Sequence, residues 1–179
     1  HAATVLTPSY NPSSAGFGAA LALVGADLLA VGAPAFPQQE TQAKGAFYTF
    51  LLSKRQGSSG GITTASVERF TPPAAALAGD MLGYSLAGSD SSLAVGSLNI
   101  NSGGSISLYR RVGDRLEQRA TLVAPEETVG FASAVALTPE GGWMAVGAPG
   151  EDAFFEEGRV LLYRIGQDDV VLVETLLGE

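Results

Sequence analysis

The densest group of side chains able to do chemistry lies in residues 149–158, which read PGEDAFFEEG. Carboxylates at this spacing could hold a cation, and adjacent aromatic side chains could anchor a protein partner. Because runs of carboxylates are more often solvated, we expect no metal here and predict a contact with a partner. The alternative for the aromatic pair is that one ring folds back onto the core. The candidate residues are Glu151, Asp152, Phe154, Phe155, Glu156 and Glu157.

Catalysis is not expected from the remaining reactive residues. The one histidine is residue 1, so a Ser-His-Asp arrangement has no central base, and the chain has no cysteine nucleophile. The glycine-rich stretch 57–61, GSSGG, lacks the Lys-Ser/Thr that a phosphate loop needs. Glu126 and Glu127 could exchange protons only if they faced each other across a cleft. We therefore expect a non-catalytic protein with no cofactor.

Composition favours one all-β domain over residues 1–179. The chain is 46% hydrophobic and holds 23 glycines and 9 prolines, a balance typical of short strands joined by tight turns. A net charge of −8, with scattered Lys and Arg, argues against nucleic acid as a partner. The longest apolar stretch, 19–36, is broken by glycines, Asp27 and Pro34, so we expect no membrane span.

Three segments of the chain repeat one pattern, with 64 residues from Gly32 to Gly96 and 51 from Gly96 to Gly147. Each is followed by a glycine, an alternating strand and a fourth strand-like run. Repeats of about fifty residues with four such runs are the size of a propeller blade. The repeated segments are GFGAALALVGADLLAVGAP (16–34), MLGYSLAGSDSSLAVGS (81–97) and GFASAVALTPEGGWMAVGAP (130–149).

This periodicity predicts about three four-stranded antiparallel blades of a β-propeller, at residues 16–73, 81–125 and 130–179. Residues 1–8 are predicted to be the outer strand of a preceding blade, because ATVLTP (3–8) resembles ATLVAP (120–125). Propellers close with about four to eight blades, so three blades imply either a part of a larger ring or pieces that associate. The alternative architecture is a generic β-sandwich.

The repeats resemble the FG-GAP repeats of integrin α-subunit propellers, and most of all the plain variant found in bacterial and protist surface proteins. The resemblance implies an extracellular or cell-surface module for adhesion, with a protein or a glycan as its ligand. Two alternatives stay open: a unit that packs with copies of itself in a surface filament, and an accessory domain of a larger enzyme. The matching residues are Phe17-Gly18 with Gly32-Ala33-Pro34, Leu82-Gly83 with Gly96-Ser97, and Phe131-Ala132 with Gly147-Ala148-Pro149-Gly150.

Integrin-type repeats often carry a D-x-D-x-D-G calcium loop between the first and second strands. The equivalent segments here hold one carboxylate each, at Asp27, Asp90 and Glu140. Calcium takes six to eight oxygen ligands, so we interpret these three residues as turn residues and expect no calcium in these loops.

The order of strands also predicts which loops share a face. In an antiparallel four-stranded blade, the loop between the second and third strands emerges beside the loop that leads to the next blade. This places the acidic segment on the face that many propellers use for ligands. Phe36 and Tyr10, in two neighbouring loops, complete the predicted partner-binding residues, and residues 99–101 are expected to extend the same surface.

Overall fold

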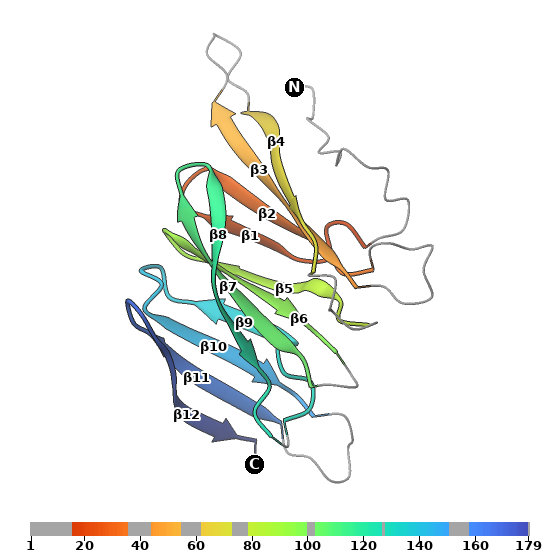
Figure 1. Ribbon diagram of the computed structural model, residues 1–179, viewed down its shortest axis with the longest axis vertical. Coiled ribbons are helices and arrows are strands. Elements are labelled where there is room, and N and C mark those ends of the chain that lie inside the picture. The colour runs from red at the N-terminus through yellow and green to blue at the C-terminus, as the bar shows by residue number, and fades with distance from the viewer. Residues whose placement is uncertain are drawn as a thin grey trace.

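The computed structural model describes residues 16–35, 44–54, 62–72, 79–99, 103–126, 128–150 and 158–178. These residues form twelve β-strands in three separate four-stranded sheets (Figure 1). Within these ranges there is no helix, and hence none that could cross a membrane. The prediction of an all-β chain with three four-stranded antiparallel sheets is confirmed.

Each sheet is a simple antiparallel meander in chain order. The first sheet contains β1 (Leu21–Val24), β2 (Leu28–Ala33), β3 (Ala46–Lys54) and β4 (Ile62–Phe70). The second contains β5 (Leu82–Gly88), β6 (Ser92–Ser97), β7 (Ser105–Val112) and β8 (Arg115–Val123). The third contains β9 (Ala134–Leu137), β10 (Trp143–Ala148), β11 (Arg159–Ile165) and β12 (Val170–Leu177).

This topology gives the molecule two edges with different connections. The first-to-second and third-to-fourth strand turns lie on one edge, which we call the turn edge. The second-to-third strand loops and the links between sheets lie on the other, which we call the connection edge. β10 ends at Ala148 and β11 begins at Arg159, both on the connection edge.

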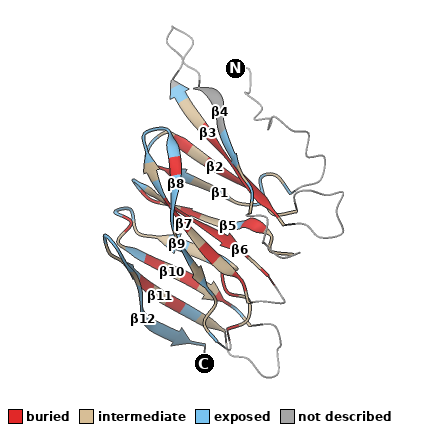
Figure 2. Ribbon diagram, viewed as in Figure 1, coloured by how far each residue is buried: buried red, intermediate tan, exposed pale blue. Residues whose placement is uncertain are grey.

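The sheets lie face to face along the long axis, so the second sheet is covered on both faces (Figures 1 and 2). One apolar cluster between the first and second sheets includes Leu28, Phe47, Leu93 and Tyr109. A second cluster, between the second and third sheets, includes Ile106, Leu108, Phe131, Met144 and Leu161. Alternation of side chains along each strand explains how one strand serves both clusters.

The two junctions between sheets are built in the same way. In each, a short turn that precedes the next sheet lies on a pair of glycines in the sheet before it. Residues 81–84 lie over Gly32 and Gly45, and residues 130–133 lie over Gly96 and Gly104. A Cβ on Gly32 would meet the Gly83 carbonyl oxygen at 2.1 Å, and one on Gly104 would meet the Phe131 carbonyl oxygen at 2.3 Å. Glycine is required here because the two backbones come this close.

Polar contacts join the sheets along the turn edge. The backbone N–H of Gly25 donates to the Ser89 carbonyl oxygen between the first and second sheets. The N–H of Asp90 donates to the Pro139 carbonyl oxygen between the second and third, and both bonds measure 2.9 Å. Successive first-to-second strand turns are therefore tied to one another, which fixes the order and spacing of the stack.

Candidate functional site

All eight residues predicted to bind a partner lie outside the described residues. Their role on the connection edge therefore stays a prediction. They are Tyr10, Phe36, Glu151, Asp152, Phe154, Phe155, Glu156 and Glu157.

Asn99, which was expected to extend the exposed loop surface, is instead buried. Its side-chain amide donates a hydrogen bond to the Asp80 carboxylate, at the link between the first and second sheets. A buried amide must be hydrogen-bonded to avoid a large desolvation cost, so Asn99 holds the connection edge together. Residues 100–101 lie outside the described ranges.

Asp27, Asp90 and Glu140 lie between the first and second strands of their sheets, and Asp27 has a further role. Its Oδ1 accepts a hydrogen bond of 2.7 Å from Nη1 of Arg111, which belongs to the next sheet. This hydrogen bond, more than any other influence, lowers the pKa of the Asp27 carboxyl below its ordinary value. Among the described residues, no group of three or more His, Asp or Glu side chains is placed to hold a metal ion.

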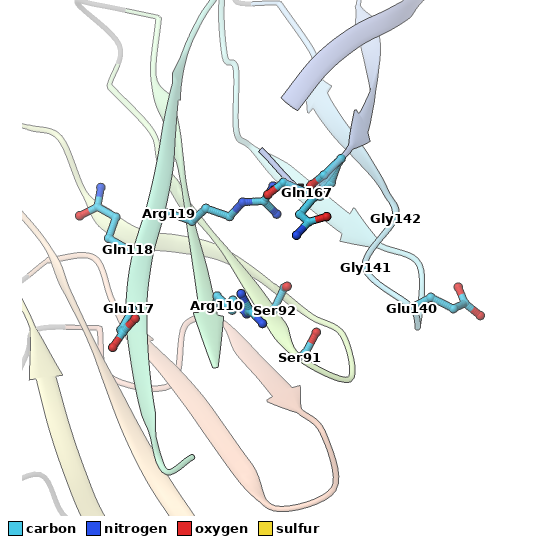
Figure 3. A pocket seen from close by; sticks show the side chains of 12 residues that line it. Ser91, Ser92, Arg110, Glu117, Gln118, Arg119, Glu140, Gly141, Gly142 and Gln167 are labelled. Carbon is cyan, nitrogen blue, oxygen red and sulfur yellow. Dashed lines mark hydrogen bonds between the residues drawn. The ribbon is translucent and has the colours of Figure 1, made fainter. Parts of the chain in front are cut away.

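A polar hollow of about 560 Å³ lies on the turn edge between the second and third sheets (Figure 3). Arg119 extends from β8 toward Gln167 and donates to the carbonyl oxygens of Gly166 and Gln167. This guanidinium ties the two sheets together, and Glu140 points outward at the rim. The lining residues are Ser91, Ser92, Arg110, Glu117, Gln118, Arg119, Glu140, Gly141, Gly142, Ile165, Gly166 and Gln167.

The walls of this hollow can form hydrogen bonds with a ligand. Its walls offer hydroxyl, amide, guanidinium and carboxylate groups, and none of them forms a nucleophile–base pair in the described structure. Sequence reasoning missed the hollow because its residues come from five separate segments. No local motif marks such a site.

The phenols of Tyr109 and Tyr163 are part of the apolar packing. Burial raises the pKa of Tyr109 to about 12 and also raises the pKa of Tyr163. The Tyr109 ring packs edge-on against Phe47 at 5.3 Å and Phe70 at 5.5 Å between ring centroids, which joins the first and second sheets. Both hydroxyls stay protonated near neutral pH and serve packing.

A second hollow, of about 460 Å³, opens on the outer face of the third sheet beside β11 and β12, and it is largely apolar. Val160 and Leu176 pair across β11 and β12 and keep 38% and 46% of their surface exposed. Their counterparts on the first sheet, Phe47 and Phe70, are covered by the second sheet. This face is therefore an uncovered copy of an interior surface.

No protein-family model matches this chain, and no curated protein has a significantly similar sequence. The internal repeat and the geometry of the sheets remain the basis for inferring function.

Proposed function

We propose that this chain is a propeller-type segment of a cell-surface or extracellular protein, and that it works by binding rather than by catalysis. Its ligand is a protein or a glycan, bound at the connection edge. The observation that carries the proposal is the repeated junction, in which residues 81–84 and 130–133 seat in the same way on successive sheets.

The spacing between neighbouring sheets supports a radial arrangement, as in a propeller. Neighbouring sheets come within backbone contact at the second strand of each sheet, at Gly32 and Gly96, although Leu28 and Leu93 of the same strands also pack between the sheets. Further along each sheet the gap is filled by large rings, with Phe47 and Phe70 stacked at 4.4 Å and Tyr109 against both. A stack that is narrow at one side and wide at the other is a wedge, and wedges repeated around an axis form a propeller.

A binding role is supported by the resemblance of the repeats to FG-GAP repeats and by the chemistry of the acidic, aromatic loop 149–158. Aromatic side chains flanked by charged ones in sequence are compatible with a protein-binding loop, because aromatic residues are enriched in protein interfaces. The described residues supply hydrogen-bonding and packing groups, and the reactive residues of the sequence form no motif for catalysis.

The proposal is tested by presenting the purified chain to a panel of extracellular proteins and immobilised glycans. The double variant Phe154→Ser/Phe155→Ser should lose the captured ligand while keeping the far-ultraviolet spectrum and melting temperature of the parent chain. Val112→Ser, which removes an exposed apolar side chain from the turn edge, is the matched control and should bind normally. Unfolding of the double variant would mean that the rings belong to the core. Equal binding by both variants would contradict the connection edge as the binding surface.

A further inference from the structure

The outer face of the third sheet lacks the cover that its equivalents have. Opposite Gly32, Gly96 and Gly147 on the neighbouring strands lie Phe47, Ile106 and Val160 respectively. Phe47 and Ile106 are fully buried by the next sheet, whereas Val160 is 38% exposed. The hollow described above is thus the position at which a next sheet would dock.

Within the chain, this position is filled by a turn of defined shape, which we call the plug. In all three copies the first and third residues of the turn have positive φ and the fourth residue donates its N–H to the first carbonyl. The φ values are 68° and 92° for Gly16 and Gly18, 42° and 84° for Met81 and Gly83, and 73° and 72° for Gly130 and Ala132. The N–H···O distances are 2.9, 3.1 and 3.1 Å in the same order.

The receiving surface, which we call the socket, is the pair of glycines together with the apolar pair beside it. The Leu82 N–H donates to the Lys44 carbonyl oxygen at 2.9 Å, and Leu82 forms a parallel bridge with Gly45. In the third sheet the equivalent glycines are Gly147 and Gly158. The atoms nearest to a Cβ on either one belong to Ala134 and Pro149 of the same sheet, at 3.3 Å or more. This socket is complete and uncovered.

The plug at residues 16–19 is equally complete and also uncovered. Phe17 packs edge-on against Phe50 of its own sheet at 6.1 Å, as Phe131 packs against Tyr163 at 6.5 Å. Phe131 is fully buried, but Phe17 is only half-buried, and nothing in the described structure lies within 4 Å of a Cβ on Gly18.

The strand that follows this plug is exposed as well. Leu21 and Leu23 of β1 are 62% and 51% exposed. The residue equivalent to Leu21 in the second sheet, Leu86, packs into the cluster between the first and second sheets. The described stack therefore presents an unpaired plug and an exposed β1 at one end and an unpaired socket at the other, while Val31, Tyr48 and Phe50 elsewhere on the outer face of the first sheet are buried.

We infer that the plug of one copy of this chain docks into the socket on the third sheet of a second copy. The occupant is a second copy because the chain itself carries a preformed plug whose backbone shape matches the two plugs already seated inside it. Contacts of this kind are head-to-tail, so copies associate into a ring if the rotation closes and into a filament if it does not. The inference does not depend on what the connection edge binds.

Two variants separate the halves of the contact without touching the internal junctions. Gly147→Ala fills the socket: its Cβ makes only ordinary contacts within the third sheet, but the equivalent Cβ on Gly32 would lie 2.1 Å from the seated plug. Leu21→Lys places a charge on the exposed face beside the plug. Both positions lie on uncovered faces, so both variants should keep the melting temperature of the parent at low concentration.

The test measures mass by sedimentation and light scattering between about 1 and 100 µM, a range in which contacts of modest affinity become visible. The parent chain should form dimers or larger species, and each variant alone should be monomeric. An equimolar mixture of the two should form dimers and nothing larger, because one intact plug meets one intact socket. Dimers in the mixture but not in either variant would establish the head-to-tail contact.

Other outcomes overturn the inference. A parent chain that stays monomeric at the highest concentration contradicts docking between copies, and leaves the connection edge as a binding surface unaffected. Association that persists in Gly147→Ala, with the fold intact by circular dichroism, shows that copies meet through another surface.

A third variant, Ala134→Ser, adds to the socket the hydroxyl group that Ser85 donates to the carbonyl oxygen of the seated Ala132. It should tighten docking about fivefold, the typical effect of one added hydrogen bond, and no tightening would count against the proposed geometry.

Discussion

The hydroxyl of Ser85 donates a hydrogen bond of 2.7 Å to the carbonyl oxygen of Ala132, and both residues are buried where the second and third sheets meet. Ala132 is the third residue of the plug at 130–133, so this bond holds the plug in its socket. The corresponding position in the first sheet is Ala20, and the junction there forms without such a bond.

Ser85→Ala should therefore destabilise the chain by about 1 kcal/mol, because the Ala132 carbonyl oxygen loses a buried partner. Denaturation by urea, followed by circular dichroism, measures the free energy of unfolding. Ser91→Ala, at an exposed serine of the β5–β6 turn, is the control and should change stability little. Equal effects of the two substitutions would show that the Ser85 bond contributes nothing measurable.

Gly96→Ala should be more damaging than Ser85→Ala. An added Cβ at Gly96 would lie 2.1 Å from Ser85 Oγ and 2.8 Å from the Ala132 carbonyl oxygen, so the plug must shift. Overpacking of this kind costs about 1–3 kcal/mol. Gly142→Ala meets no atom within 4 Å and should be neutral or slightly stabilising. Thermal melting curves of Gly96→Ala and Gly142→Ala measure the difference. Equal melting temperatures would contradict close packing at Gly96.

Arg111→Ala should loosen the contact between the first and second sheets. Its guanidinium donates to the carbonyl oxygens of Val24 and Gly113, each at 2.8 Å, as well as to Asp27. Loss of the carbonyl bonds leads us to expect about 1–2 kcal/mol less stability. Asp27→Asn keeps both carbonyl bonds and should have a much smaller effect, since the Asp27 side chain is well exposed. Thermal unfolding of both variants measures this. A lower melting temperature for Asp27→Asn than for Arg111→Ala would mean that the ion pair contributes more stability than the carbonyl bonds.

Stability should fall in alkaline solution as Tyr109 ionises. Burial raises its pKa to about 12 from an ordinary value of 10.0, so the folded chain retains the proton over a range in which the unfolded chain loses it. The stabilisation is complete below the unfolded pKa and is lost as the pH rises through that range. The test measures the free energy of unfolding as a function of pH for the parent chain and for Tyr109→Phe. The variant should be less sensitive to alkali, and identical pH profiles would contradict the buried phenol as the cause.

Calcium should leave the melting temperature of the chain unchanged. The turns that hold Asp27, Asp90 and Glu140 offer one carboxylate each, and a ligand bound only by the folded state would stabilise it by mass action. Differential scanning calorimetry with millimolar calcium and with a chelator measures this directly. A rise of many degrees that disappears in Asp152→Asn/Glu156→Gln would instead identify the acidic loop as a cation site.

Much of the architecture could be predicted from the order of residue types along the chain. Strands follow from local patterns such as LLAVGA and WMAVGA, and the antiparallel order within each sheet follows from the repeat of four strand-like runs joined by turns. The glycines Gly32, Gly96 and Gly147 marked the same position in the three copies of the repeat. These properties depend on neighbours in sequence, so a single amino-acid sequence was enough to predict them.

Other features were decided only when distant segments met. Asp27 looked like a turn residue until folding placed Arg111, 84 positions later, beside it. Asn99 looked like part of an exposed loop, yet packing buries it against Asp80. The polar hollow around Arg119 has no local motif. Its members are brought together by the stacking of two sheets.

The amino-acid sequence by itself determined the strands, their order within each sheet and the three repeats, because those depend on side-chain alternation and turn chemistry over a few residues. The tertiary structure decided which plug is seated and which socket is left uncovered. Residues 16–19 and 130–133 share one turn geometry, but only the second turn meets a preceding sheet in the described structure. Whether a turn is buried depends on the sheet that packs against it. That sheet lies many residues away in the chain or in another molecule.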